Sequence, residues 1–157
     1  MYTSTPGEFP NRWGRQSAVF ASEYSDPWLK AWEVTKALIA KTKHKADDLD
    51  AAFLLLGVSD PISVMPPEIQ EQVFPPEIRA ALDRDKPIGL LRDFADSAGI
   101  DFLTLVPKFR AEIGESAEAF TTYYLPCDGH WSEAGNRLAA ETLAAYLRPI
   151  IGKRLAP

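Results

Sequence analysis

The stretch Ala51-Ala52-Phe53-Leu54-Leu55-Leu56-Gly57-Val58 is a short apolar run without a charge, and it ends at Ser59-Asp60-Pro61. An uncharged run of this length between a helix and a turn is typical of a strand that is buried on both faces, as in a parallel sheet. We therefore expect a buried strand over residues 53–58, with the rest of an α/β domain arranged around it.

The segment before this strand has the pattern of an amphipathic helix. Asp26-Pro27 is a typical helix start, with Asp as the cap and Pro at the first helical position. One face then carries residues at spacings of three and four: Trp28, Trp32, Thr35, Leu38 and Ile39. These residues predict a helix over residues 27–45.

The segment after the strand alternates short helices with a second strand. Two copies of Pro-Pro-Glu-Ile, starting at Pro66 and Pro75, each predict a short helix with Pro and Glu in its first turn. A helix is expected over residues 87–98, with Gly99 as its C-cap. The remaining expectations are a strand over 102–105, a short helix over 107–113, a Glu- and Ala-rich connection, an extended piece over 121–125 and a last helix over 132–147.

The order helix, strand, helix, strand, loop, helix is that of an α/β layered domain with a small, mainly parallel sheet. The chain has 157 residues, of which 46% are hydrophobic and 25% charged, as in one globular domain. Residues 1–26 lack helical or strand periodicity and predict an irregular N-terminal arm. The aromatic residues Trp13, Phe20 and Tyr24 indicate that this arm is packed and not disordered, and the remaining domain spans residues 27–157.

Composition also excludes several classes of function. The formal net charge is −5, so no basic surface for nucleic acid is expected. A single cysteine, Cys127, leaves no disulfide within the chain. The first residues have neither a basic start nor an apolar core, so they do not predict a signal peptide. No apolar run approaches the roughly 18 residues that a membrane span needs.

The stretch Leu125-Pro126-Cys127-Asp128-Gly129-His130-Trp131 carries the candidate chemistry. Side chains two residues apart in an extended segment point to the same side, so Asp128 and His130 can converge on one site. An aspartate that holds one imidazole nitrogen leaves the other free to take a proton from a nucleophile. The only other histidine, His44, lies in a Lys-rich run that predicts a solvated helix face. From spacing alone, Asp-x-His is also found in surface loops where the aspartate caps a turn.

The block from Leu125 to Glu141, with its Asp-x-His-Trp and the helix of small residues behind it, resembles the last conserved block of SGNH (GDSL-like) hydrolases. The helix and strand pattern back to Trp28 resembles, more loosely, the C-terminal half of their flavodoxin-like three-layer fold. The resemblance implies an ester hydrolase or acyl-transfer enzyme with a Ser-His-Asp site. By this resemblance, Asp128 would orient the imidazole of His130, and His130 would be the general base. It implies no cofactor, and a small-molecule or carbohydrate ester as substrate.

The sequence departs from the family pattern in three ways. Ser132 stands where the family usually has Asn, and Asn136 where a second His is common. The third departure concerns the nucleophile, because these 157 residues contain no Gly-Asp-Ser block and no Gly-x-Asn segment. We therefore expect this chain alone to be inactive, with its serine in a missing segment or in a separate chain that acts as a complementing N-terminal half. An open sheet edge, with self-association, would follow from such a partial fold.

Other nucleophiles and ligands are weaker candidates. Ser59 follows the first strand, but Pro61 is expected to prevent a helix from starting there as in a nucleophile elbow. Ser116 lies in an acidic linker, and Cys127 lies too close to His130 in sequence to admit a substrate carbonyl between them. Asp128 and His130 lack the third and fourth ligands that a metal site requires. The alternatives are a non-catalytic remnant that acts as a binding module, and an unrelated α/β protein in which the loop is structural.

Overall fold

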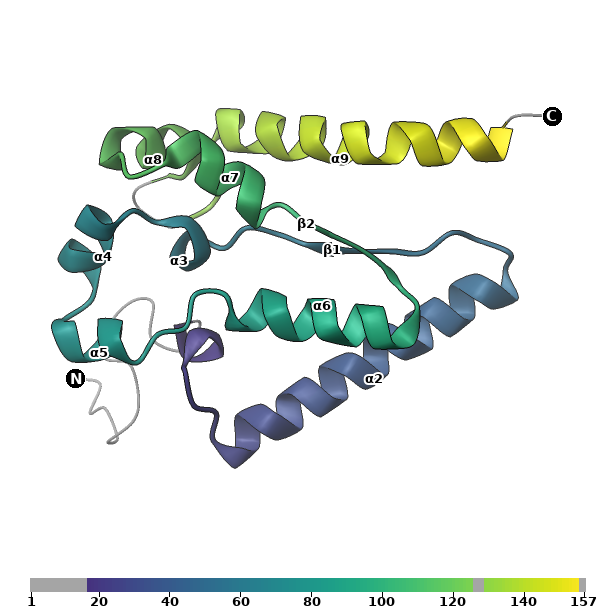
Figure 1. Cartoon of the computed structure of the whole chain (residues 1–157), viewed down its shortest axis with the longest axis horizontal. Helices are drawn as coiled ribbons and strands as arrows, with labels where there is room; N and C mark the ends of the chain where they lie inside the picture. Colours follow the sequence, from purple (N-terminus) through teal and green to yellow (C-terminus); the bar gives the residue numbers. More distant parts are fainter. Residues whose placement is uncertain (1–16, 126–128, 156–157) are drawn as a thin grey trace. The chain divides into compact units, whose positions relative to one another are not determined.

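The computed structural model describes residues 17–125 and 129–155 of the chain. These residues form a mixed α/β structure that is mostly helical and contains a two-stranded parallel sheet (Figure 1). The elements are η1 Ala18–Phe20, α2 Asp26–Asp48, β1 Leu54–Gly57, α3 Pro61–Val64, α4 Pro67–Val73, α5 Pro76–Ala80, α6 Lys86–Ala98, β2 Asp101–Thr104, α7 Val106–Ile113, α8 Ala117–Tyr123 and α9 Glu133–Leu155.

The chain divides into two compact units. The described part of the first unit comprises residues 17–55 and 74–102, and that of the second comprises 56–73, 103–125 and 129–155. The division falls within each strand, after Leu55 in β1 and after Phe102 in β2. Each strand therefore contributes residues to both units.

The first strand lies within the segment predicted for it, and the second begins and ends one residue earlier than predicted. Pairing continues past their ends, because the Leu105 amide donates to the Gly57 carbonyl oxygen at 2.9 Å. The expectation of a strand buried on both faces is wrong. The leucines of β1 are only half-buried, and Val58 directly after it is 56% exposed. A two-stranded sheet cannot enclose a strand as a larger parallel sheet does, so an apolar run alone did not determine burial.

Helix α2 begins one residue earlier than predicted and ends three residues later. Ser25 is its N-cap, and Asp26 belongs to the first turn instead of capping the helix. No residue of α2 is buried, and Leu38 of the predicted apolar stripe is 60% exposed. At its start, the Tyr24 ring stacks on Trp28 with 6.3 Å between ring centroids.

The segment around η1 is tied to the turn before α6. The Ser22 amide donates to the Ala81 carbonyl at 2.8 Å, and the Asp83 amide donates to the Phe20 carbonyl at 2.7 Å. Phe20 is buried, as expected for a packed arm, while Trp13 lies outside the described residues. Helix α6 ends at Ala98, and the predicted C-cap Gly99 has a φ of 62°, the left-handed conformation typical of that position.

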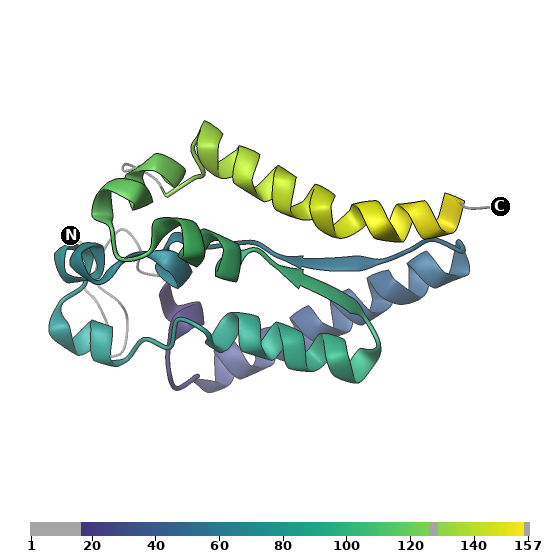
Figure 2. The same ribbon diagram turned by 45° about the horizontal axis from the view of Figure 1, so that its top comes forward.

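In the second unit, α7 packs against α3 and α8, and α8 packs against α9 (Figure 2). Helix α3 corrects the expectation that Pro61 prevents a helix at this point. Pro61 is the first residue of α3, and the Asp60 carboxylate accepts a hydrogen bond of 2.8 Å from the Ile62 amide. Proline is compatible with a first helical turn, because the amide that it lacks would have no partner within the helix.

Two further predictions are wrong. The Glu- and Ala-rich connection and the start of the extended piece over 121–125 form α8, whose N-cap Ser116 accepts a hydrogen bond from the Ala119 amide. Only Tyr124 and Leu125 follow this helix before the loop. Helix α9 does not stop at residue 147 but continues to Leu155 with Pro149 inside it. A proline inside a helix removes one backbone hydrogen bond, but the helix can continue past it.

Several large apolar side chains are exposed on the described residues: Leu29, Val34, Leu38, Leu49, Val58, Leu125 and Ile151. None of the helices in the part of the chain that the structure describes combines the length and the apolar character needed to cross a membrane.

Candidate functional site

The segment between α8 and α9 folds back on itself as a hairpin. Tyr124 and Trp131 form an antiparallel bridge, and the Leu125 amide donates to the His130 carbonyl oxygen at 2.8 Å. The Gly129 amide donates to the Leu125 carbonyl at 3.1 Å, and Gly129 has a φ of 75°. A glycine accepts this left-handed conformation without a steric penalty, which permits the bend beside His130.

His130 is exposed at this hairpin. This placement agrees with the solvent access that general-base catalysis would need. Asp128 and Cys127 lie outside the described residues, so the predicted approach of Asp128 to the imidazole stays a prediction. His44 lies on the exposed side of α2, where its ring is 3.9 Å from the Asp48 carboxylate.

The start of α9 gives the hairpin a rigid base. The Ser132 amide donates to the Tyr123 carbonyl at 2.9 Å. The Ser132 hydroxyl accepts a hydrogen bond of 3.2 Å from the Gly135 amide, so Ser132 caps the N-terminus of α9. The Asn136 side-chain amide donates to the Ser132 carbonyl at 2.9 Å, so Ser132 and Asn136 both stabilise this helix start.

Aromatic side chains fill the space beneath the hairpin. Phe109 on α7 is fully buried and stacks on Trp131, with 5.5 Å between centroids and 21° between the ring planes. Phe120 on α8 stacks on Tyr124 at 5.0 Å and 13°. Rings in such contact contribute stability beyond their buried area, and their shape restricts how far the hairpin can move.

Ser59, in the turn between β1 and α3, receives polar contacts from both stems of the hairpin. The Tyr124 hydroxyl donates toward the Ser59 hydroxyl at 2.7 Å and toward the Ser59 carbonyl at 3.0 Å. The Trp131 indole donates to the same carbonyl at 3.2 Å. Burial is the main cause that raises the pKa of Tyr124 to about 12, and burial likewise raises the pKa of Asp60 beside it.

The two serines weighed as nucleophiles both have structural partners. Ser59 is 3% exposed and hydrogen-bonded to Tyr124, so a substrate cannot reach its hydroxyl without disrupting the core. Ser116 caps α8 through its hydroxyl.

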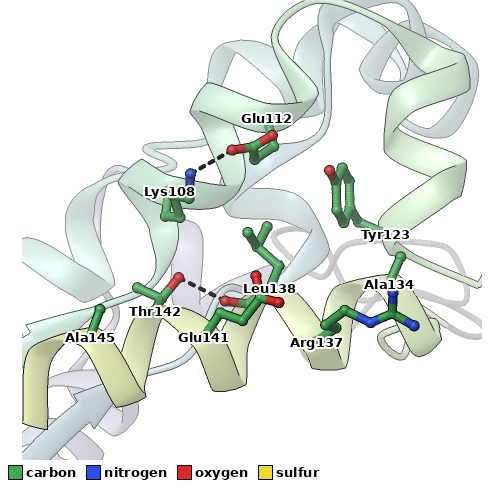
Figure 3. Close-up of a pocket in the computed structure, with 9 residues that line it drawn as sticks. All are labelled: Lys108, Glu112, Tyr123, Ala134, Arg137, Leu138, Glu141, Thr142 and Ala145. Carbon is green, nitrogen blue, oxygen red and sulfur yellow. Dashed lines mark hydrogen bonds and ion pairs between the residues drawn. The ribbon is translucent and has the colours of Figure 1, made fainter. Parts of the chain in front are cut away.

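A pocket of about 530 Å³ lies between α7, α8 and α9 (Figure 3). Its lining residues are Lys108, Glu112, Tyr123, Ala134, Arg137, Leu138, Glu141, Thr142 and Ala145. Lys108 pairs with Glu112 at 2.5 Å, and Arg137 pairs with Glu133 at 2.8 Å. The hydrogen bond to Glu112 is the main cause that raises the pKa of Lys108. Both cations thus have an acidic partner on their own helix, and His130 is not part of the lining.

Within residues 17–125 and 129–155, no three His, Cys, Asp or Glu side chains gather as metal ligands. Sequence reasoning did not connect Ser59 with the hairpin, because the two lie 65 to 72 residues apart. The available signal was that the loop is flanked by Tyr124 and Trp131, which combine an apolar ring with one polar group and usually find a hydrogen-bond partner when buried.

Comparison with known proteins gave no match to a protein-family model, to a curated protein or to a solved structure.

Proposed function

We propose that this chain is the His- and Asp-bearing part of an SGNH-type ester hydrolase or acyl-transfer enzyme, with a partial flavodoxin-like fold. His130 is its general base, and Asp128 orients the imidazole. The observation that supports this proposal best is the exposed His130 on a hairpin whose two stems are anchored in a buried aromatic core. Catalytic groups require such a combination of access and fixed position.

In the proposed reaction, the catalytic groups come from two polypeptide segments. A serine hydroxyl outside these 157 residues attacks the ester carbonyl, and the His130 imidazole takes the proton from that hydroxyl. The imidazolium then returns the proton to the leaving alcohol, and water repeats the cycle on the acyl-enzyme. The substrate is a small-molecule or carbohydrate ester. The complementing polypeptide supplies the serine and the donors that stabilise the oxyanion.

The first experiment tests the chain by itself with p-nitrophenyl acetate. We expect the purified chain to hydrolyse this ester no faster than an exposed imidazole does, because loss of a serine nucleophile removes most of the rate enhancement of a triad. Turnover that is lost in Ser59→Ala or Cys127→Ala would show that the nucleophile lies within this chain and would contradict the division proposed here.

The second experiment adds a polypeptide that carries a Gly-Asp-Ser half. Turnover should appear and should be abolished by His130→Ala, and Asp128→Asn should reduce it strongly. His44→Ala is the matched control, since it removes the other exposed histidine far from the hairpin in sequence, and it should leave turnover unchanged. Binding of the added polypeptide without any turnover would favour the non-catalytic interaction module.

A further inference from the structure

We propose that Ser59 is a positioning residue that holds His130 in place through Tyr124 and Trp131. This inference rests on the proposed function only in assigning a catalytic task to His130. The link between Ser59 and the hairpin depends on the geometry alone.

The first step is that two donors from opposite stems of the hairpin meet at one residue. Tyr124 precedes the loop and Trp131 follows it, and both reach the Ser59 carbonyl oxygen, at 3.0 and 3.2 Å. The Ser59 hydroxyl adds a third contact, 2.7 Å from the Tyr124 hydroxyl. Ser59 therefore joins the two stems of the hairpin through side chains, in addition to the backbone bridge between them.

The second step concerns what would happen without these contacts. Tyr124 is 1% exposed and Ser59 is 3% exposed, so water does not readily replace a lost partner. Removing one partner of a buried hydrogen bond leaves the other unsatisfied, which costs more than the bond itself contributes. The phenol also remains protonated, and thus a donor, well above neutral pH.

The third step connects the hydrogen bonds at Ser59 to the imidazole of His130. His130 directly precedes Trp131, and its carbonyl oxygen accepts the Leu125 amide at 2.8 Å. A shift of the Trp131 stem thus changes the backbone from which the imidazole projects. The stacked Phe109 ring restrains Trp131 from one side, and the hydrogen bond to Ser59 fixes the rotation of the indole.

The test uses Tyr124→Phe and Ser59→Ala in the full chain, with Tyr123→Phe as the matched control. Tyr123 neighbours Tyr124, and its ring lies by the pocket between α7 and α9 (Figure 3). Amide hydrogen exchange at Leu125 and Gly129 reports on the closed hairpin, since both amides donate within it. The ring signals of His130 and His44 in a carbon-13 NMR spectrum report on the two imidazoles separately.

We expect exchange at Leu125 and Gly129 to become about tenfold faster in Tyr124→Phe, which loses the hydrogen bonds to both Ser59 oxygens. The acceleration should be smaller in Ser59→Ala, because the backbone carbonyl of residue 59 still accepts from Tyr124 and Trp131. The His130 ring signal should shift while that of His44 does not. The double variant should change exchange little beyond Tyr124→Phe alone, because that substitution already removes the contact that Ser59→Ala removes. Tyr123→Phe should change neither readout.

Unchanged exchange and an unchanged His130 signal in both variants would overturn the inference. Equal acceleration of all slowly exchanging amides would also overturn it, because it would show a general loss of stability. These readouts need no activity, so they stand if complementation never yields turnover. Where turnover is obtained, Tyr124→Phe should lower kcat about tenfold at an unchanged KM.

Discussion

Among single residues, the Tyr124 phenol makes the folded state sensitive to alkaline pH. Its pKa rises to about 12 on folding, chiefly through burial, so folding favours the neutral phenol. The resulting stability is fully present below the ordinary value near pH 10 and is lost as the pH rises through about 12. A difference of two pKa units corresponds to about 2–3 kcal/mol. Urea unfolding at pH 9 and pH 12 should show this loss of the free energy of unfolding.

The Tyr124→Phe variant distinguishes the alkaline loss of stability caused by Tyr124 from the loss caused by other ionisable groups. The variant should be about 1 kcal/mol less stable than the wild type at pH 7, because it lacks the hydrogen bonds to Ser59. It should lack the alkaline loss of about 2–3 kcal/mol that Tyr124 causes in the wild type, so the two stability curves should meet and cross as the pH rises from 10 to 12. Tyr123→Phe should keep the full alkaline loss. A loss in Tyr124→Phe as large as in the wild type would contradict the assignment.

Within helix α9, two glycines with different surroundings give a matched pair of substitutions. A Cβ atom on Gly135 would lie 2.3 Å from the Tyr123 carbonyl oxygen and 3.0 Å from the Trp131 Cβ atom, whereas one on Gly152 would meet nothing within 4 Å. Gly135→Ala should therefore destabilise the chain by about 1–3 kcal/mol, as other overpacked sites do. Gly152→Ala should stabilise it by up to about 1 kcal/mol through helix propensity. Thermal unfolding measures both, and a stabilising Gly135→Ala would show that α9 can move away from the hairpin.

The cap of helix α3 yields a prediction of its own. Asp60 accepts a hydrogen bond from the Ile62 amide, but burial raises the pKa of its carboxyl group. Its carboxylate is thus disfavoured in the folded state at neutral pH, and this cost disappears as the pH falls below the ordinary aspartate value. Asp60→Asn keeps the cap without the charge, so it should be more stable than the wild type at pH 7, and the difference should shrink towards pH 3.5. Asp60→Ala loses the cap and should cost about 1 kcal/mol at pH 7. A destabilised Asp60→Asn in urea titrations would contradict this assignment.

The elements differ in how well their sequences predicted them. The spacing in α2 and α6 and the apolar runs of β1 and β2 located these elements to within three residues, because periodicity is a local property. The predicted end of the last helix at residue 147 was wrong, because the chain continues as a helix to Leu155 with Pro149 inside it. Burial was less predictable than element type. The Leu54–Gly57 strand has the composition of a core strand, yet its burial depends on how many strands the sheet has.

The candidate site likewise has a part that the local sequence predicted and a part that depends on residues far apart in the sequence. His130 and its loop were evident from the sequence, because two histidines leave few choices and the Ser132 cap follows directly. The hydrogen bonds between Ser59 and the hairpin were not evident from the sequence, because hydrogen bonds between residues 65 positions apart have no local signature. The sequence indicated Ser59 only as a possible nucleophile, because it follows a strand.

At the scale of the whole molecule, the free edges of the sheet and the exposed apolar side chains lead to a prediction of self-association. In the part of the chain that the structure describes, β1 has a hydrogen-bonded strand on one side only. Unprotected strand edges pair readily with other chains, and natural proteins often block them with lysine. We therefore expect sedimentation velocity to show dimers or larger species that increase with protein concentration.

The position of Val58 allows this expectation to be tested against a control. Val58 is 56% exposed directly after β1, so Val58→Lys places a charge at the end of that strand. Leu38 is 60% exposed on α2, and Leu38→Lys makes a comparable change away from the sheet. If the edge of β1 mediates association, Val58→Lys should shift the distribution towards the monomer, whereas Leu38→Lys should not. The opposite result would place the association surface on α2, and a wild-type chain that stays monomeric at all concentrations would contradict an open sheet edge altogether.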